Sequence, residues 1–215
     1  MSISNYKNIF YPTKNNSHVV RALVHDNVWE QKIVNIFKKN INKNDVVVDI
    51  GSYIGLHTIG MSTLAKKVIS FEPQPLISAC VRKTLNAKEI KNVEHYNIAL
   101  GNHTGWTYIE TNGDGDASIK GIREKKIFNK SLRCKIDKLD NIIKEKVSLI
   151  KIDVEGYEWL VLSGAILTIQ LYKPIIILET RRSKKNMKQL EEFCEVMEYS
   201  SSYISSDNFL LMPFF

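Results

Sequence analysis

Residues 46–55 read VVVDIGSYIG, and they are the strongest indication of the fold. The apolar, β-branched run predicts a buried strand, and the D-x-G-x-x-x-G pattern that follows at once predicts a tight turn into a helix. Gly51 lets the backbone turn sharply and approach a ligand closely, and Gly55 permits close packing where the helix begins. The free N–H groups at that helix start favour a carboxylate or a phosphate. A tight turn without a ligand is the alternative.

Strands and helices alternate outward from this turn. The predicted strands are 45–50, 67–71, 93–97, 147–153 and 174–179, the predicted helices are 27–39, 56–65, 75–86, 158–171 and 186–197, and short strands at 200–204 and 208–212 follow. Near-continuous apolar strands between helices are typical of a mostly parallel sheet that helices cover on both faces. We therefore predict an α/β fold with a doubly wound sheet, in which ligands bind beyond the carboxyl ends of the strands.

We expect a single domain over residues 1–215, because the sequence has no internal repeat and no linker rich in Pro, Gly or Ser. Residues 1–40 form a polar leader and a helix, for which Asn27 and Glu30 make a plausible capping box. Residues 105–136 form an inserted hairpin, in which antiparallel strands at 105–111 and 131–136 flank a polar stretch. We interpret that stretch, residues 112–130, as a mobile lid or an acceptor-binding loop.

Glu72 ends the second strand within VISFEP, residues 68–73, and follows Gly51 by about 20 residues. An acidic side chain at this place can accept both hydroxyl protons of a ribose. A carboxylate that caps a helix or faces water is the alternative. These features fit NAD as well as S-adenosylmethionine (SAM). NAD sites usually carry G-x-G-x-x-G, however, and the pattern from Asp49 to Gly55 favours SAM.

A third motif, LIKIDVEGYE at residues 149–158, places Asp153 and Glu155 at the end of the fourth strand, and Glu179 ends the fifth. A cluster of acids at this edge suits a sulfonium cation, a general base or a divalent metal. Asp153 and Glu179 could hold Mg²⁺ that binds and acidifies an acceptor hydroxyl. Alternatively, Glu155 caps the helix that follows.

Taken together, five stretches resemble the FkbM-type methyltransferases. They are VVVDIGSYIGLHT (46–58), ISFEPQP (69–75), LNAKEIKNVEHYNIALGNHTG (85–105), LIKIDVEGYEWLVLSGA (149–165) and PIIILE (174–179). The resemblance runs from about Trp29 to Glu179. It implies a class I, Rossmann-like SAM-dependent methyltransferase with about seven strands, the last of them antiparallel. It also implies O-methylation, often of sugars, glycans or polyketide-type metabolites.

Through matched positions the resemblance implies a donor site. Its expected residues are Asp49, Gly51, Ser52, Tyr53, Gly55, Thr58, Glu72, Pro73, Asn97, Ile98, Ala99 and Asp153. The first turn would hold the methionine portion of SAM, Glu72 the ribose and residues 97–99 the adenine, with Asp153 near the amino group or the reacting methyl. The family commonly has Ala-Asn at positions 52–53, and a glycine near the last helix end where this chain has Glu198-Tyr199.

The expected reaction is an in-line displacement, in which an acceptor oxygen attacks the methyl carbon and S-adenosylhomocysteine (SAH) leaves. Alignment of the reactants can supply up to ~7–11 kcal/mol of the barrier. A base that takes the hydroxyl proton adds ~10²–10⁴-fold. Our candidates for that base are Glu155, Asp153 and His57, in that order. A structural or exposed histidine is the alternative for His57.

The net charge of +7 comes from 30 Lys and Arg against 23 Asp and Glu, and basic residues cluster at 120–138 and 181–188. Such patches attract anionic partners such as a nucleotide sugar, a phospholipid surface or RNA, although a solvated face is the alternative. We expect a small-molecule or glycan acceptor. RNA or cap 2′-O methylation is an alternative, but no basic stretch is interleaved with aromatic residues that stack bases. An NAD-dependent oxidoreductase and a non-catalytic nucleotide-binding domain are alternatives of other classes.

We expect a soluble, cytoplasmic protein with reduced thiols. Residues 1–16 are polar, which predicts no signal peptide. The apolar runs are too short to span a bilayer. Cys80, Cys134 and Cys194 lie far apart without a C-x-x-C pair, and the histidines make no zinc spacing.

Overall fold

The computed structural model describes residues 3–13, 17–26, 28–111, 117–118 and 131–214. A seven-stranded sheet of order β12-β13-β11-β10-β3-β4-β5 forms its centre. Its strands are β3 (Val46–Ile50), β4 (Lys67–Phe71), β5 (Val93–Tyr96), β10 (Leu149–Ile152), β11 (Ile175–Glu179), β12 (Tyr199–Ser205) and β13 (Asn208–Pro213). The five strands from β11 to β5 are parallel, and β13 runs antiparallel to β11 and β12. The predicted α/β fold with a mostly parallel sheet is confirmed.

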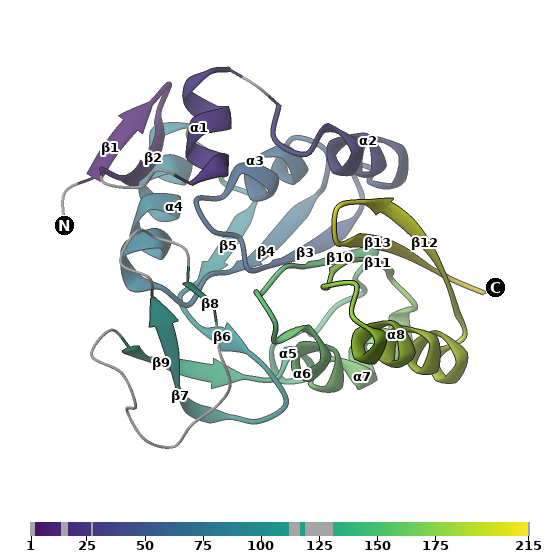
Figure 1. The fold of residues 1–215 in the computed structure, drawn as a ribbon. Helices are drawn as coiled ribbons and strands as arrows, with labels where there is room; N and C mark the ends of the chain where they lie inside the picture. The colour runs from purple at the N-terminus through teal and green to yellow at the C-terminus, as the bar shows by residue number, and fades with distance from the viewer. Residues whose placement is uncertain (1–2, 14–16, 27, 112–116, 119–130, 215) are drawn as a thin grey trace.

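Helices cover both faces of this sheet, as Figure 1 shows. They are α1 (His18–Val24), α2 (Gln31–Asn40), α3 (Leu56–Ser62), α4 (Pro75–Ala87), α5 (Leu139–Ile142), α6 (Glu158–Ser163), α7 (Ile166–Tyr172) and α8 (Lys184–Met197). Successive strand residues point to opposite faces. Val47 and Leu149 therefore pack with α2 and α3, whereas Val48 and Ile150 pack with α6, α7 and α8. Within the described ranges, none of the helices is long and apolar enough to cross a membrane.

The N-terminal segment contains more regular structure than the polar leader that the sequence predicts. Strands β1 (Ile3–Tyr6) and β2 (Ile9–Pro12) form an antiparallel hairpin that contacts α4. Helix α1 begins after Ser17, whose hydroxyl accepts the N–H of Val20 at 3.2 Å. Val20 packs in a third apolar cluster with Ile54, in the loop after β3. The leader is therefore anchored beside the glycine turn.

The predicted capping box of the first long helix is wrong. Helix α2 begins at Gln31, and Glu30 is its N-cap residue in the left-handed conformation, with φ 48° and ψ 56°. The Glu30 side chain makes no capping hydrogen bond and instead reaches His57. Asn27, the other member of the expected box, lies outside the described residues. The buried face of the helix, Ile33 and Phe37, is as predicted.

The single helix predicted at 158–171 is two helices. Helix α6 ends at Ser163 and α7 begins at Ile166, with Gly164 between them. A Cβ atom on Gly164 would lie 1.8 Å from the carbonyl oxygen of Gly101. The chain therefore bends where the loop after β6 (Ala99–Leu100) presses against it.

A second sheet of order β6-β9-β7-β8 lies beside the first (Figure 1). Strands β7 (Gly105–Thr111) and β9 (Ser131–Asp137) pair antiparallel, as the sequence predicts, and β8 (Ala117–Ser118) pairs with the end of β7. The expected lid at 112–130 lies outside the described residues except for β8.

Two substitutions in α7 test which face of this helix is buried. Ile169 is fully buried, whereas Leu167 is 67% exposed. We expect Ile169→Ala to lower the free energy of unfolding by about 2–5 kcal/mol, because it leaves a cavity. Leu167→Ala should change it by less than about 0.5 kcal/mol. Urea denaturation measures both, and equal losses would contradict the packing of this face.

Candidate active site

A pocket opens where β3, β4, β10 and β11 end, at the edge of the sheet where this kind of fold binds ligands. The predicted site residues that line it are Asp49, Gly51, Ser52, Tyr53, His57, Glu72, Pro73, Ile98, Ala99, Asp153, Glu155 and Glu179. Gly55, Thr58 and Asn97 were also predicted, and they contact residues of the lining instead. The structure thus brings together side chains from four strand ends.

Gly51 is required by the packing of two turns. Its φ is 81°, a conformation that glycine adopts without strain, and a Cβ atom there would lie 1.7 Å from the backbone carbonyl oxygen of Asp153. The Gly51 and Ser52 N–H groups both donate to the Phe71 carbonyl at 3.0 Å. The turn after β3 is therefore fixed between the ends of β4 and β10. The sharp turn predicted at Gly51 is present, and the atom that a side chain there would meet is the Asp153 carbonyl oxygen.

Asp49 and Ser52 each have a buried polar oxygen without a partner in the part of the chain that the structure describes. Asp49 is fully buried, and its Oδ2 accepts the hydroxyl of Thr58 at 2.5 Å. Among the described residues, Asp49 Oδ1 and Ser52 Oγ have no hydrogen-bond partner. A buried polar atom without a partner costs about 1–3 kcal/mol. Both residues line the pocket, so a ligand with N–H or O–H groups would satisfy them.

Two backbone donors fix the Glu72 carboxylate at the end of β4. Its Oε2 accepts the N–H of Tyr53 at 3.0 Å, and its Oε1 accepts the N–H of Gln74 at 2.8 Å. Asn97 Nδ2 donates to the Glu72 carbonyl at 2.8 Å, which ties this residue to the end of β5. Burial raises the pKa of Glu72 to about 8, although the two N–H donors lower it. Without a ligand, Glu72 holds a proton at neutral pH.

A buried lysine stands among the acids at the other end of the pocket. Lys151 Nζ lies 2.9 Å from Asp153 Oδ2, and the lysine side chain is 3% exposed. Burial alone would lower the pKa of Lys151, but the charges of Asp153 and Asp49 outweigh it and raise that pKa. Burial would raise the pKa of Asp153, but Lys151 outweighs it and lowers that pKa. Burial, reinforced by the charge of Asp153, raises the pKa of Glu179 to about 8.

The donor set at this end does not fit the Mg²⁺ site considered for Asp153 and Glu179. The described residues contain no group of three or more His, Cys, Asp or Glu side chains placed to hold a metal ion. Asp153 is already paired with the Lys151 ammonium, and Glu179 carries a proton at neutral pH, so the two residues do not offer the pair of free carboxylates that Mg²⁺ prefers.

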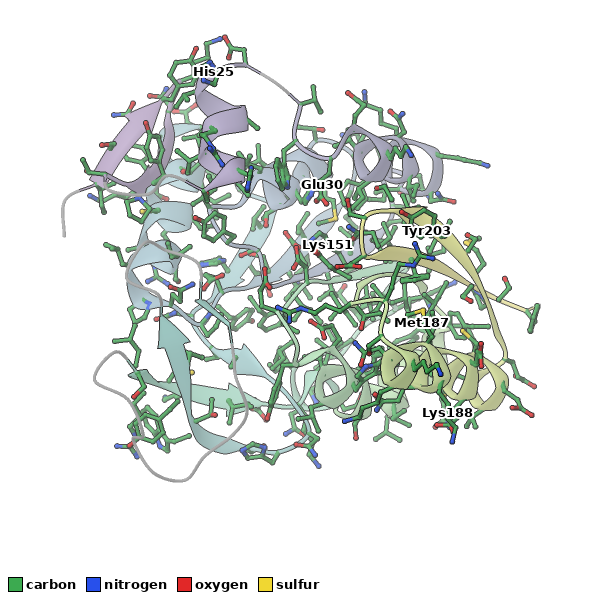
Figure 2. The ribbon with its side chains drawn as sticks, in the orientation of Figure 1. His25, Glu30, Lys151, Met187, Lys188 and Tyr203 are labelled. Carbon is green, nitrogen blue, oxygen red and sulfur yellow. The ribbon has the colours of Figure 1, made fainter. Side chains whose placement is uncertain are left out.

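His57 is paired with Glu30, a residue that the sequence did not place in the site. His57 Nε2 lies 2.7 Å from Glu30 Oε2, and the two side chains are 10% and 20% exposed. Asn208 Nδ2 donates to Glu30 Oε1 at 3.3 Å. Glu30 and Lys151 both line the pocket, and both are labelled in Figure 2. Glu30 reaches the pocket through the packing of α2 near α3, which no local sequence pattern reveals.

Glu155 occupies the turn after β10. Its side chain is exposed, its φ is 58°, and it lines the mouth of the pocket. Tyr53 and Glu30 also line the pocket with positive φ, at 49° and 48°. Left-handed backbone at residues other than glycine costs of order 1–3 kcal/mol each and gathers at functional sites. Three of the ten non-glycine residues with positive φ in the described part of the chain thus line this pocket.

A family model described as the methyltransferase FkbM domain matches residues 49–204. No curated protein matches the chain at a significant level.

Solved structures share the fold at low sequence identity. The methyltransferase FkbM of Methylobacillus flagellatus KT has a TM-score of 0.60 and 15% identity, and the match covers 83% of this chain and 50% of that one. A putative methyltransferase of Streptococcus mutans in complex with SAH has a TM-score of 0.55 and 13% identity, covering 84% and 94%. An rRNA methylase of Streptococcus thermophilus has a TM-score of 0.54 and 14% identity, covering 83% and 91%. Our chain spans about half the length of the first of these.

Substitution of two glycines tests the packing of the turn. Gly51→Ala should lower the free energy of unfolding by at least about 2 kcal/mol, because the methyl group meets the Asp153 carbonyl and the backbone is left-handed. Gly60, inside α3, has open space where a methyl group would lie, with no neighbouring atom within 4 Å. Gly60→Ala should therefore raise that free energy by up to about 1 kcal/mol. Chemical denaturation compares them, and a neutral Gly51→Ala would refute the contact.

Proposed function

Because the chain belongs to the FkbM methyltransferase family, we propose that it transfers the methyl group of SAM to a hydroxyl oxygen of a sugar, a glycan or a nucleotide sugar. One observation carries the proposal. The Glu72 carboxylate, fixed by the N–H groups of Tyr53 and Gln74, stands directly beside the Gly51 turn in one pocket. This pair of features suits the ribose and the amino-acid portion of an adenosyl donor.

The strand order supports one direction for the donor. Strands β4 and β5 lie on one side of β3, and β10 and β11 lie on the other. Ribose and adenine would lie toward Glu72, Ile98 and Ala99, on the first side. The amino acid and the sulfonium would lie toward Asp153, on the second side. Asp49 Oδ1 and Ser52 Oγ, which have no partner among the described residues, lie between, where donor N–H groups would satisfy them.

SAM supplies a methyl group already activated by the sulfonium charge, so the protein must mainly align the reactants. A fixed pocket can supply up to ~7–11 kcal/mol of the barrier in this way. The acids at the β10 and β11 ends would accept hydrogen bonds from acceptor hydroxyls. Glu155, Asp153 and His57 are the candidates for the base. Asp153 is the weakest of them, because its ion pair with Lys151 lowers its pKa.

One surface favours RNA as a second candidate acceptor. Pairing of β7 with β9 places the Arg133 guanidinium 4.3 Å and the Lys135 ammonium 5.9 Å from the Trp106 ring centroid, and Trp106 is 52% exposed. Basic and aromatic side chains are thus interleaved in space, although not along the sequence. Such a surface can stack an unpaired base beside phosphates. RNA binding should weaken steeply with salt, and insensitivity to salt would exclude it.

A two-stage experiment tests the main proposal. Calorimetry should show that SAH binds the folded protein, whereas NAD causes no thermal shift. Labelled SAM should then methylate at least one member of a panel of nucleotide sugars and oligosaccharides. Absence of SAH binding would refute the methyltransferase proposal. Binding of SAH with no transfer to any hydroxyl, in this panel or in RNA, would support a non-catalytic domain.

Glu72 should make donor binding depend on pH. The ligand hydroxyls need an ionised carboxylate, but the free protein holds a proton there with a pKa of about 8. SAH affinity should therefore rise by up to about tenfold per pH unit below 8 and level off above it. Glu72→Gln should weaken binding by about 10–150-fold and abolish this slope, since a charged hydrogen bond contributes about 1.5–3 kcal/mol.

Glu179→Gln is the matched control, because Glu179 has a similarly raised pKa at the opposite end of the pocket. Calorimetry between pH 6 and 9 should show that this variant keeps most of the slope. Loss of the slope in Glu179→Gln, with the slope retained in Glu72→Gln, would contradict the ribose assignment.

A further inference from the structure

We propose that His57 is the base that takes the acceptor's hydroxyl proton, and that Glu30 is the positioning residue that holds its ring. This inference rests on the proposed methyl transfer to oxygen. It assigns a role to Glu30, which precedes the residues matched by the family model. It also selects His57 over Glu155, the first candidate from the sequence.

The geometry of the pair carries the inference. Glu30 Oε2 lies 2.7 Å from His57 Nε2, which leaves Nδ1 as the ring nitrogen able to accept a proton. Within the described part of the chain, His57 makes its side-chain hydrogen bond through Nε2 and none through Nδ1, and the residue lines the pocket. An acid on the far nitrogen of a histidine fixes its tautomer and stabilises the imidazolium that forms.

The pair is held in place from several sides. The Phe37 ring meets the His57 ring edge-on, with centroids 5.4 Å apart and an interplanar angle of 83°. The Glu30 carbonyl accepts the N–H groups of Ile33 and Val34 at the start of α2, while its side chain turns toward α3. Asn208, at the start of β13, donates to the other carboxylate oxygen. The left-handed backbone at Glu30 is thus maintained by contacts that aim its side chain at His57.

Acidic side chains line the pocket beside the pair, where the imidazolium would form during the reaction. Asp49 lies on β3, and Asp153 follows β10 and is paired with Lys151. Glu155 is less suitable, because it is exposed and water weakens the basicity that a carboxylate gains from burial. His57 and Glu30 are mostly shielded from solvent.

The methyl transfer and the proton transfer to His57 need no further reactant. The hydroxyl proton passes to His57 Nδ1 as the acceptor oxygen bonds to the methyl carbon. The electron pair of the carbon–sulfur bond stays on sulfur, and the sulfonium charge is thereby removed. The positive charge is then on the imidazolium, whose Nε2–H donates to Glu30. Solvent removes the proton after the product leaves.

The tautomer of His57 tests the geometry without an acceptor. Long-range ¹H–¹⁵N spectra of the ligand-free protein at pH 8 should show His57 protonated at Nε2, with His57→Asn identifying its signals. Glu30→Gln should leave a mixture of tautomers, because the amide can donate as well as accept. Glu195→Gln removes an equal charge from the exposed face of α8 and should change nothing. An Nδ1–H tautomer in the wild type would overturn the proposal.

Kinetic measurements test whether His57 acts as the base and Glu30 positions it. With labelled SAM and the nucleotide sugar that the wild type methylates fastest, His57→Asn should lower kcat by about 10²-fold or more. Glu30→Gln should lower kcat by about tenfold, and SAH affinity should change by less than about twofold in both variants. The pH optimum of kcat should move in Glu30→Gln, a shift that a merely structural role would not produce.

The outcomes separate the two proposals. A wild type that does not bind SAH would refute the methyltransferase assignment. A wild type that methylates a sugar while Glu30→Gln and His57→Asn keep its rate would refute only the base pair. A larger loss of kcat in Glu155→Gln than in His57→Asn would identify Glu155 as the base instead.

Discussion

The site depends on the contact between the Gly51 turn and the Asp153 carbonyl. No side chain fits between these two backbones, so the ends of β3 and β10 approach as closely as main chains can. The N–H of Asp153 donates to the Ile50 carbonyl at 3.0 Å, and the Gly51 N–H donates to the Phe71 carbonyl. Three strand ends are therefore joined by backbone atoms before any ligand binds. Because these strand ends are held together, the side chains that follow them face one pocket.

The contact between these strand ends brings several carboxylates into one pocket, and their mutual repulsion must be offset. Asp49, Glu72, Asp153 and Glu179 line one pocket, and Lys151 is the buried cation among them. Two features reduce the negative charge at neutral pH. Lys151 pairs with Asp153, and burial raises the pKa of Glu72 and of Glu179 to about 8. A positively charged donor would relieve the remaining repulsion on binding. The electrostatics therefore suit a sulfonium better than a dinucleotide, whose phosphates would meet these carboxylates.

The sequence predicts the sheet well, because its central strands are continuous apolar runs between amphipathic helices. The place of Glu72 in the pocket was also predictable. It ends β4, and its spacing from Gly51 follows from the same order of strand, turn and helix. The place of Glu30 was not predictable, because its approach to His57 follows from how α2 packs, and the capping-box pattern pointed elsewhere. The break at Gly164 likewise depends on a distant residue, Gly101, which periodicity within the helix does not reveal.

The alternation of side chains along β7 bears on whether RNA can be the acceptor. Thr107 and Ile109 are buried, and Ile109 lines the pocket, whereas Trp106 is exposed. Because successive strand residues face opposite sides, the Trp106 surface with Arg133 lies on the face of this sheet turned away from the pocket. An RNA strand bound there would have to pass around the sheet to bring a hydroxyl to His57. A sugar hydroxyl needs no such path, because the acids that would hold it line the same pocket as the proposed base.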